Sequence, residues 1–215
     1  MKYCISDVHG CSKTLVALLE KIDLQPTDVV YFLGDYVDRG PDSKGVLDIV
    51  MNLDNAVCHK GNHEDMLLRA INNQNDVNAQ AHWWQNGGAA CIESFGGDVG
   101  SEYLAFISSL KLITELDKFY LCHAGISNEA LNTPEEVILW DRTCEVDIAK
   151  TGGRKLICGH TPTDLDTIKS DLICEDKIII DAGCVFSHYE EYGYLVALRL
   201  DDMKVYEQRN IDVKV

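Results

Sequence analysis

The chain has 215 residues, of which 46% are apolar and 25% are charged, so it can bury a substantial core and is not a disordered, collagen-like or coiled-coil chain. Its 35 Asp and Glu residues outnumber its 19 Lys and Arg residues, which gives a formal net charge of −16. This charge repels nucleic acid and anionic membranes, so we expect neither as a partner, and a phosphate ester needs local positive charge to bind.

Short apolar runs alternate with segments of helical periodicity at the start of the chain. The runs predict strands at Lys2–Ser6, Val29–Leu33 and Ala56–His59. The periodic segments predict helices at Ser12–Ile22, Ser43–Leu53 and Glu64–Asn72. An order in which each strand is followed by a helix is typical of a parallel sheet with helices on its faces.

The rest of the chain begins with a segment, Asn73–Leu110, that we expect to be mainly helical. Further strands are predicted at Phe119–Cys122, Lys155–Cys158, Ile178–Ile180, Tyr194–Leu200 and Lys204–Gln208. Asp201 and Asp202 form a plausible turn between the last two strands, which predicts an antiparallel hairpin. The sequence contains no internal repeat, low-complexity tract or Pro/Gly-rich linker, so we expect a single domain over residues 1–215.

The cysteines and the apolar runs indicate where the protein resides. The nine cysteines are an odd number with no C-x-x-C pair, which predicts a reducing cytoplasm and no disulfide framework. No apolar run reaches the roughly 18 residues of a membrane span. The first residues, Met1 to Asp7, become polar too early for a signal peptide.

Side chains that bind metals follow five of the predicted strands, at the point where each strand ends. They are Asp7 and His9, Asp35 and Asp38, Asn62 and His63, His123, and His160. Because loops at the carboxyl ends of strands converge on the ligand crevice of an α/β fold, we expect these side chains to share one pocket. His and carboxylate ligands without thiolate suit Mn, Fe or Zn.

The number of these ligands indicates two metal ions rather than one. They are too many for a single tetrahedral ion but sufficient for two ions that share one carboxylate. Two divalent ions outweigh the charges of Asp7 and Asp35, so the pocket keeps the positive charge that an acidic protein needs to hold a phosphate. Two ions about 3.5–4 Å apart also hold the nucleophile and the phosphoryl oxygens for an in-line displacement.

Five motifs in this order resemble those of the calcineurin-like metallophosphoesterases. They are Ser6-Asp7-Val8-His9-Gly10, Gly34-Asp35-Tyr36-Val37-Asp38-Arg39-Gly40, Gly61-Asn62-His63-Glu64, His123-Ala124-Gly125 and Gly159-His160-Thr161. The second and third resemble the PPP-type phosphatase branch. The chain length, the stretch His82-Trp83-Trp84…Asn86-Gly87-Gly88 and the motif Trp140-Asp141-Arg142 are similar to those of small bacterial and phage serine/threonine protein phosphatases. The resemblance implies an α/β fold, a four-layer α/β/β/α sandwich with mixed sheets.

The resemblance also implies a ligand set for two divalent metal ions, with Mn expected and Fe or Zn as alternatives. Asp7 and His9 would hold the first ion, and Asp35 would bridge both. The second ion would be completed by Asn62, His123 and His160. Pro162 stands where many other metallophosphoesterases place a further His, which argues against the phosphodiesterase branch.

The remaining roles implied by the resemblance are catalytic. His63, paired with Asp38, would be the general acid that protonates a leaving alkoxide, and Asp38 would orient the imidazole and favour its protonated form. Arg39 and Arg142 would bind phosphate oxygens in bidentate fashion. A hydroxide that bridges the metals would attack phosphorus directly, with no covalent intermediate.

These expectations define a phosphomonoesterase with a binuclear metal centre, most similar to a serine/threonine protein phosphatase that acts on a phosphorylated protein or peptide. Two alternatives stay open: hydrolysis of symmetrical dinucleoside polyphosphates at the same site, and a metal-binding scaffold without turnover. We interpret His59, His82 and His188 as structural, and the pair Trp83-Trp84 as packing. The sequence does not indicate which oligomeric state the protein has or what role the rim segment Gly183–Tyr192 plays.

Overall fold

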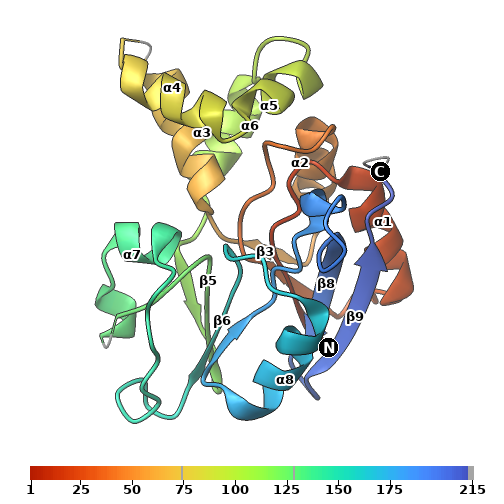
Figure 1. Ribbon diagram of the computed structural model, residues 1–215, viewed down its shortest axis with the longest axis vertical. Coiled ribbons are helices and arrows are strands. Elements are labelled where there is room, and N and C mark those ends of the chain that lie inside the picture. The colour runs from red at the N-terminus through yellow and green to blue at the C-terminus, as the bar shows by residue number, and fades with distance from the viewer. Residues whose placement is uncertain (74, 128, 213–215) are drawn as a thin grey trace.

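Two β-sheets pack face to face in the computed structural model of the protein, which describes residues 1–73, 75–127 and 129–212 (Figure 1). The strand order is β3-β2-β1-β8-β9 in the first sheet and β4-β5-β6-β7 in the second. The strands are β1 (Lys2–Ile5), β2 (Val29–Phe32), β3 (Ala56–Cys58), β4 (Ile113–Glu115), β5 (Phe119–Cys122), β6 (Lys155–Cys158), β7 (Lys177–Ile179), β8 (Tyr194–Arg199) and β9 (Lys204–Arg209).

Both sheets combine a parallel centre with antiparallel strands at an edge. β1, β2 and β3 are parallel neighbours, as are β5, β6 and β7. β8 runs antiparallel to β1 and to β9, and β4 runs antiparallel to β5. The predicted parallel order and the C-terminal hairpin are therefore confirmed, whereas the short edge strand β4 was not anticipated.

Helices cover the outer face of each sheet and gather at one end of the molecule. They are α1 (Ser12–Lys21), α2 (Ser43–Met51), α3 (Asn62–Asn72), α4 (Val77–Gln85), α5 (Gly88–Ser94), α6 (Ser101–Ser108), α7 (Glu135–Trp140) and α8 (Leu165–Cys174), with 3₁₀ turns η1 (Ala130–Asn132) and η2 (Cys184–Phe186). α3 to α6 project above the sheets in Figure 1. The first three predicted helices are confirmed with ends shifted by one or two residues, and α7 and α8 are additional.

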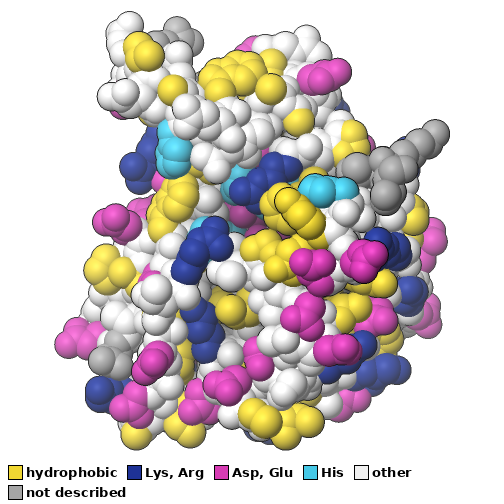
Figure 2. Space-filling view, in the orientation of Figure 1, with side chains coloured by type: hydrophobic (Ala, Val, Ile, Leu, Met, Phe, Trp, Pro, Cys, Tyr) yellow, Lys and Arg dark blue, Asp and Glu magenta, His cyan; other side chains and the backbone are white. Residues whose placement is uncertain are grey.

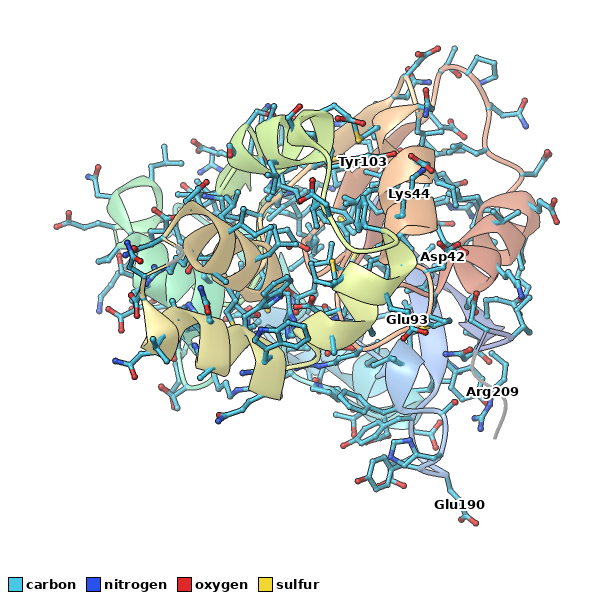
Figure 3. All side chains as sticks on the ribbon, turned by 90° about the horizontal axis from the view of Figure 1, so that it is seen from above. Asp42, Lys44, Glu93, Tyr103, Glu190 and Arg209 are labelled. Atoms are coloured by element: carbon cyan, nitrogen blue, oxygen red, sulfur yellow. The ribbon has the colours of Figure 1, made fainter. Side chains whose placement is uncertain are left out.

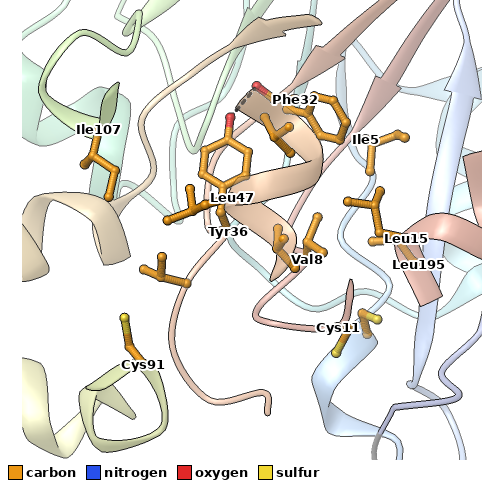
Figure 4. Packing of buried hydrophobic residues seen from close by; sticks show 14 of the residues in the cluster. Ile5, Val8, Cys11, Leu15, Phe32, Tyr36, Leu47, Cys91, Ile107 and Leu195 are labelled. Carbon is orange, nitrogen blue, oxygen red and sulfur yellow. Dashed lines mark hydrogen bonds between the residues drawn. The ribbon is translucent and has the colours of Figure 1, made fainter. Parts of the chain in front are cut away.

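The alternation of side chains along the strands explains the layers. Tyr3 and Ile5 of β1 pack under the helices, while Cys4 between them faces the second sheet, as the two-residue period of a strand requires. Figure 4 shows Ile5 and Phe32 packed with Leu15 of α1. A third cluster places Leu139 of α7 on the outer face of the second sheet. The predicted four-layer α/β/β/α sandwich is confirmed.

Two observations bear on the expected location of the protein. Within the described residues, no helix has the length and apolar character that crossing a membrane requires. The nine cysteines are free thiols, and six of them are buried. The cytoplasmic location stays a prediction.

Candidate metal centre

Sharp turns after the strands place the predicted site residues in an uncommon backbone conformation. Positive φ angles occur at Asp7 (54°), His9 (45°), Asp35 (57°), Asp38 (70°), Arg39 (66°) and His160 (71°). Side chains other than glycine rarely adopt this left-handed region, and such strain is concentrated at functional sites. The turns bend each chain segment so that side chains from β1, β2 and β6 point at a common space.

Glycines let these turns approach one another closely. A Cβ atom at Gly61 would lie 2.1 Å from Oδ1 of Asp35, and one at Gly159 would lie 2.0 Å from Oδ2 of Asp7. Both separations are far below van der Waals contact, so each position requires glycine. The backbone of one loop therefore rests directly on the carboxylate of another.

One group of metal-binding atoms comes from three separate loops. Oδ1 of Asn62 lies 2.9 Å from Nε2 of His123 and 3.0 Å from Nδ1 of His160, and the two ring nitrogens are 3.1 Å apart. Nδ1 of His123 donates to the carbonyl of Leu33 at 2.9 Å, which leaves the Nε2 lone pair directed at the other two atoms. Bonds of about 2.1 Å at right angles place neighbouring ligands about 3 Å apart, so these atoms fit a shared cation.

A second group consists of His9, Asp35 and His63. Oδ2 of Asp35 lies 3.4 Å from Nε2 of His9 and 3.9 Å from Nε2 of His63. Nδ1 of His9 is 2.9 Å from the carbonyl of Val37, so this ring too presents Nε2 to the site. Oδ1 of Asp35 lies 3.5 Å from Nε2 of His123. The Asp35 carboxylate therefore lies between the two groups, where a bridging ligand is expected.

The charges in this space also fit a cation. Burial, together with the negative charges of Asp7 and Glu64, holds the pKa of Asp35 well above its ordinary value. A nearby positive charge is what stabilises such a carboxylate in its ionised form. The imidazole nitrogens and the carboxylate and amide oxygens of the site are ligands that suit the divalent ions predicted from the sequence. A cation would also offset the repulsion between the carboxylates of Asp7, Asp35 and Glu64.

Asp7 reaches the site from β1 but lies outside both groups. Its carboxylate accepts from Ser6 Oγ and from the backbone N–H of His160 at 3.0 and 3.1 Å, and it is buried. The structure places His63, rather than Asp7, in the group with His9 and Asp35. The expected role of Asp7 as a ligand of the first ion stays a prediction.

The two predicted arginines border opposite parts of this centre. Nη1 of Arg39 contacts Nε2 of His9 at 2.7 Å. The guanidinium therefore lies where a cation bound to Nε2 would lie, and the Arg39 side chain would have to move before a cation could bind there. Arg142 is exposed and donates to Oγ1 of Thr161 at 3.3 Å. Its charge is one of the causes that lower the pKa of His160, after burial and His123. Figure 2 shows His and Lys/Arg side chains gathered in a hollow on this face.

His63 and Asp38 form the predicted pair. Nδ1 of His63 lies 2.6 Å from Oδ2 of Asp38, and the indole N–H of Trp83 donates to both carboxylate oxygens at 3.0 and 3.1 Å. Burial lowers the pKa of His63 well below its ordinary value and raises the pKa of Asp38 to about 8. Asp38 lies where it can orient the imidazole, as expected, whereas burial acts against the imidazolium form that we expected it to favour.

Two important residues were missed by the sequence interpretation. Glu64 is fully buried and its carboxylate accepts from the backbone of two loops, including Asp35 N–H at 2.9 Å and Gly61 N–H at 2.8 Å. Trp83, which we interpreted as packing, anchors Asp38. Glu64 follows Gly61 by three residues, and a carboxylate at that spacing is a signal for a hydrogen-bond acceptor at the start of a helix. No local sequence pattern connects Trp83 with Asp38, which lies 45 positions away.

The fold and this site define a metallophosphoesterase, and comparison with known proteins agrees. Residues 3–195 match the family described as calcineurin-like phosphoesterase. The chain therefore belongs to the calcineurin-like phosphoesterase family, and we describe it as a metal-dependent hydrolase.

Two curated relatives of the chain are named as tetraphosphatases. It is 28% identical to the asymmetrical bis(5′-nucleosyl)-tetraphosphatase PrpE of Anoxybacillus flavithermus, over 93% of this chain and 90% of that protein. The symmetrical bis(5′-nucleosyl)-tetraphosphatase of Salmonella paratyphi C is 31% identical over 79% of this chain, and the chain spans about half (55%) of the length of that relative. A crystal structure of a candidate diadenosine tetraphosphatase superposes with a TM-score of 0.74 at 18% identity, covering 99% of this chain and 94% of that one.

These findings confirm the family that the motifs indicated but not its PPP-type branch. The two curated relatives described above are named as tetraphosphatases rather than as protein phosphatases. The alternative that we kept open, hydrolysis of dinucleoside polyphosphates, is therefore better supported than action on a phosphoprotein. The five motifs handle phosphate and metal, which both activities need, so they do not distinguish the two.

Proposed function

We propose that the protein is a metal-dependent hydrolase of dinucleoside tetraphosphates. One observation carries the proposal: the similarity to the tetraphosphatase PrpE extends over 93% of this chain and 90% of the relative. The two chains therefore correspond over nearly their whole lengths, and not only at the shared motifs. Water adds to one phosphorus atom and a bridging P–O bond breaks, which gives either two nucleoside diphosphates or a triphosphate and a monophosphate.

Two divalent ions would be held by the atoms described above. The first would lie beside His9 and Asp35 with Asp7 in support, and the second would lie among Asn62, His123 and His160, with Asp35 between them. Mn is the expected metal, and Fe or Zn suit the same ligands. When bound, such ions stabilise charge on phosphoryl oxygens and lower the pKa of water.

The arginines provide the phosphate contacts of the chain itself. Arg39 is half-buried beside His9, and Arg142 is exposed beside Thr161. Each guanidinium presents paired N–H groups that match two oxygens of one phosphate. Because they stand at different parts of the centre, they suit a chain of several phosphates.

The His63–Asp38 pair presents a proton donor. With Nδ1 held by Asp38 at 2.6 Å, the imidazolium form of His63 presents Nε2–H to the site, and in that form the ring donates a proton and does not ligate a metal. Within the described residues, this buried Nε2 has no hydrogen-bond partner. The leaving group of an anhydride is a nucleoside phosphate, which is far less basic than an alkoxide, so it needs this proton less than a serine or threonine ester does.

A substrate panel tests the proposal. Wild-type protein with Mn²⁺ would be given diadenosine tetraphosphate or a phosphoserine peptide, with Asp35→Asn as the inactive control. We expect a higher kcat/KM for the dinucleotide, with chromatography of the adenine nucleotides showing which bridging bond is cleaved. Preferential release of phosphate from the peptide would overturn the proposal and restore the protein phosphatase assignment.

A further inference from the structure

Aromatic rings border the candidate metal centre on two sides. On one side, His82 of α4 stacks on Trp140 of α7; we call this pair the Trp140 platform. On the other side, Phe186, His188 and Tyr189 form a cluster that we call the Phe186 platform. Neither platform has a role in the phosphate chemistry described above.

The Trp140 platform adjoins the ligand group that contains His160. The rings of His82 and Trp140 are 5.6 Å apart with an interplanar angle of 21°, and the ring of Trp140 is 6.3 Å from that of His160. His82 is exposed and Trp140 is half-buried. Both rings line a cavity of about 390 Å³ between α3, α4 and α7, so a flat molecule can enter beside the metal centre.

The charges of this cavity select what can enter. Its wall includes Asp65, Glu135 and Glu136 as well as Arg69. Arg69 is paired with Asp65 at 2.8 Å and Lys60 with Glu135 at 3.2 Å, so the excess negative charge of the cavity wall is that of Glu136. Acidic groups repel phosphate but accept hydrogen bonds from amino groups. The cavity therefore suits an uncharged aromatic ring that carries N–H donors, as the amino-bearing nucleobases do.

The Phe186 platform adjoins the other ligand group through Arg39. The guanidinium carbon of Arg39 lies 5.4 Å from the centre of the Phe186 ring, and the same side chain contacts His9. The rings of His188 and Tyr189 are 4.1 Å apart, and Tyr189 is 51% exposed. The His188 ring is tilted by 42° to that of Tyr189 and meets that of Phe186 edge-on, so a cluster of aromatic rings continues outward from Arg39.

The segment that carries this platform is fixed at its base. Gly193 N–H donates to the carbonyl of Gly183 at 3.0 Å, which closes the segment into a loop. Arg209 of β9 donates to the carbonyls of Tyr192 at 3.0 Å and Ser187 at 3.3 Å. Figure 3 shows Glu190 at the tip, projecting away from the body. The loop is therefore braced while its aromatic side chains stay accessible.

We propose that the two platforms stack the two nucleobases of the substrate, with the polyphosphate lying across the metal centre between them. This inference rests on the proposed function. Each platform borders a different ligand group, as a molecule with a base at both ends of a phosphate chain requires. Bases stack on aromatic side chains whatever their sequence, and each stack contributes substantially to binding.

The experiment measures affinity rather than turnover. Mn²⁺-loaded Trp140→Leu, Phe186→Leu and the double variant would be titrated in a calorimeter with diadenosine tetraphosphate whose bridging oxygens are replaced by methylene groups. Inorganic tetraphosphate is the ligand without bases. Trp84→Leu is the matched control, because Trp84 is 49% exposed on the same helix as His82 but lies outside both platforms. His82→Ala and Tyr189→Ala replace any variant that fails to fold.

We expect each single substitution to weaken the analogue about 5- to 150-fold relative to inorganic tetraphosphate, and the two effects to multiply. Wild-type affinity in both single variants would overturn the inference while the proposed function stands. A double variant no weaker than the single ones would also overturn it, since both rings would then contact one base. If the wild-type protein neither binds the analogue nor cleaves the dinucleotide, the proposed function itself fails.

Discussion

Replacing Glu64 by Gln tests how the loops of the metal centre are held together. One carboxylate oxygen of Glu64 accepts from Asp35 N–H at 2.9 Å and Gly61 N–H at 2.8 Å. The other accepts from Tyr36 N–H at 2.8 Å and Val37 N–H at 3.3 Å. Gln keeps the shape of Glu, but its amide offers one oxygen, so one pair of N–H groups would face another donor.

The loss can be estimated from these contacts. A hydrogen bond to a charged group contributes about 1.5–3 kcal/mol, so two lost bonds correspond to about 3–6 kcal/mol. Burial raises the pKa of Glu64, which shows that the charged form is partly destabilised by desolvation, and removing the charge relieves part of the loss. We therefore expect Glu64→Gln to lower the free energy of unfolding by about 3 kcal/mol.

Urea unfolding in the presence of EDTA measures this value without any contribution from metal binding. Glu93→Gln is the control, because Glu93 is exposed on α5 (Figure 3) and the same chemical change there should stay within about 0.5 kcal/mol. We also expect weaker Mn²⁺ binding in Glu64→Gln, since the backbone of Asp35 and Gly61 loses its anchor. A free energy of unfolding equal to that of the wild type would refute the proposed anchoring role.

Three further predictions concern groups inside and beside the site. His63→Asn should lower kcat on an alkyl phosphate by about 10²–10⁴-fold but lower it much less on a dinucleoside tetraphosphate; equal losses would argue against a proton donor. Asp35→Asn should retain less Mn²⁺ after dialysis and lose activity, and EDTA should inactivate the wild type with an unchanged circular dichroism spectrum; full activity of the variant would contradict a bridging carboxylate. His59 is buried, with its ring nitrogens 2.9 Å from Phe32 O and 2.8 Å from Thr114 Oγ1, and burial lowers its pKa to about 4. In the unfolded chain His59 has its ordinary pKa of about 6.5 and takes up a proton more readily than in the folded protein. Between pH 6.5 and pH 5 the wild type should therefore lose about 2 kcal/mol of stability relative to His59→Gln. A constant difference between the two proteins across that range would show that the folded protein does not resist protonation of His59.

The position of the site was predictable because it follows from strand ends. Polar residues after the apolar runs, such as Asp35 and His123, are brought together by the parallel order of the strands, which is itself visible as alternating runs and helical segments. The detailed grouping was not predictable in this way. His63 lies with His9 and Asp35 because α3 begins at Asn62 and places His63 in its first turn, and no sequence pattern fixes that rotation.

Contacts between distant segments account for most of what the sequence did not reveal. Trp83 anchors Asp38, and His82 stacks on Trp140. Each contact depends on how α4 packs, and the periodicity of one segment carries no information about its partners. We interpreted His82 as structural, and its part in stacking a base stays a prediction. The same limitation explains the protein phosphatase expectation, since the motifs describe phosphate handling whereas the substrate is selected by surfaces around them.

The balance of charge explains why phosphate binding at this site depends on cations. Asp7, Asp35 and Asp181 are all buried, and Asp181 lies close enough to the other two that, after burial itself, their charges raise its pKa. These three carboxylates outnumber the guanidiniums of Arg39 and Arg142. A polyphosphate that approached this space without metal would meet net repulsion inside a protein whose formal charge is −16. Two divalent ions held here would reverse the sign, and a cation bound at Nε2 of His9 would displace the Arg39 guanidinium that now contacts this atom at 2.7 Å. If Arg39 binds phosphate as proposed, metal binding would make it available, so affinity for inorganic tetraphosphate should rise with Mn²⁺ occupancy more steeply in the wild type than in a variant that lacks Arg39.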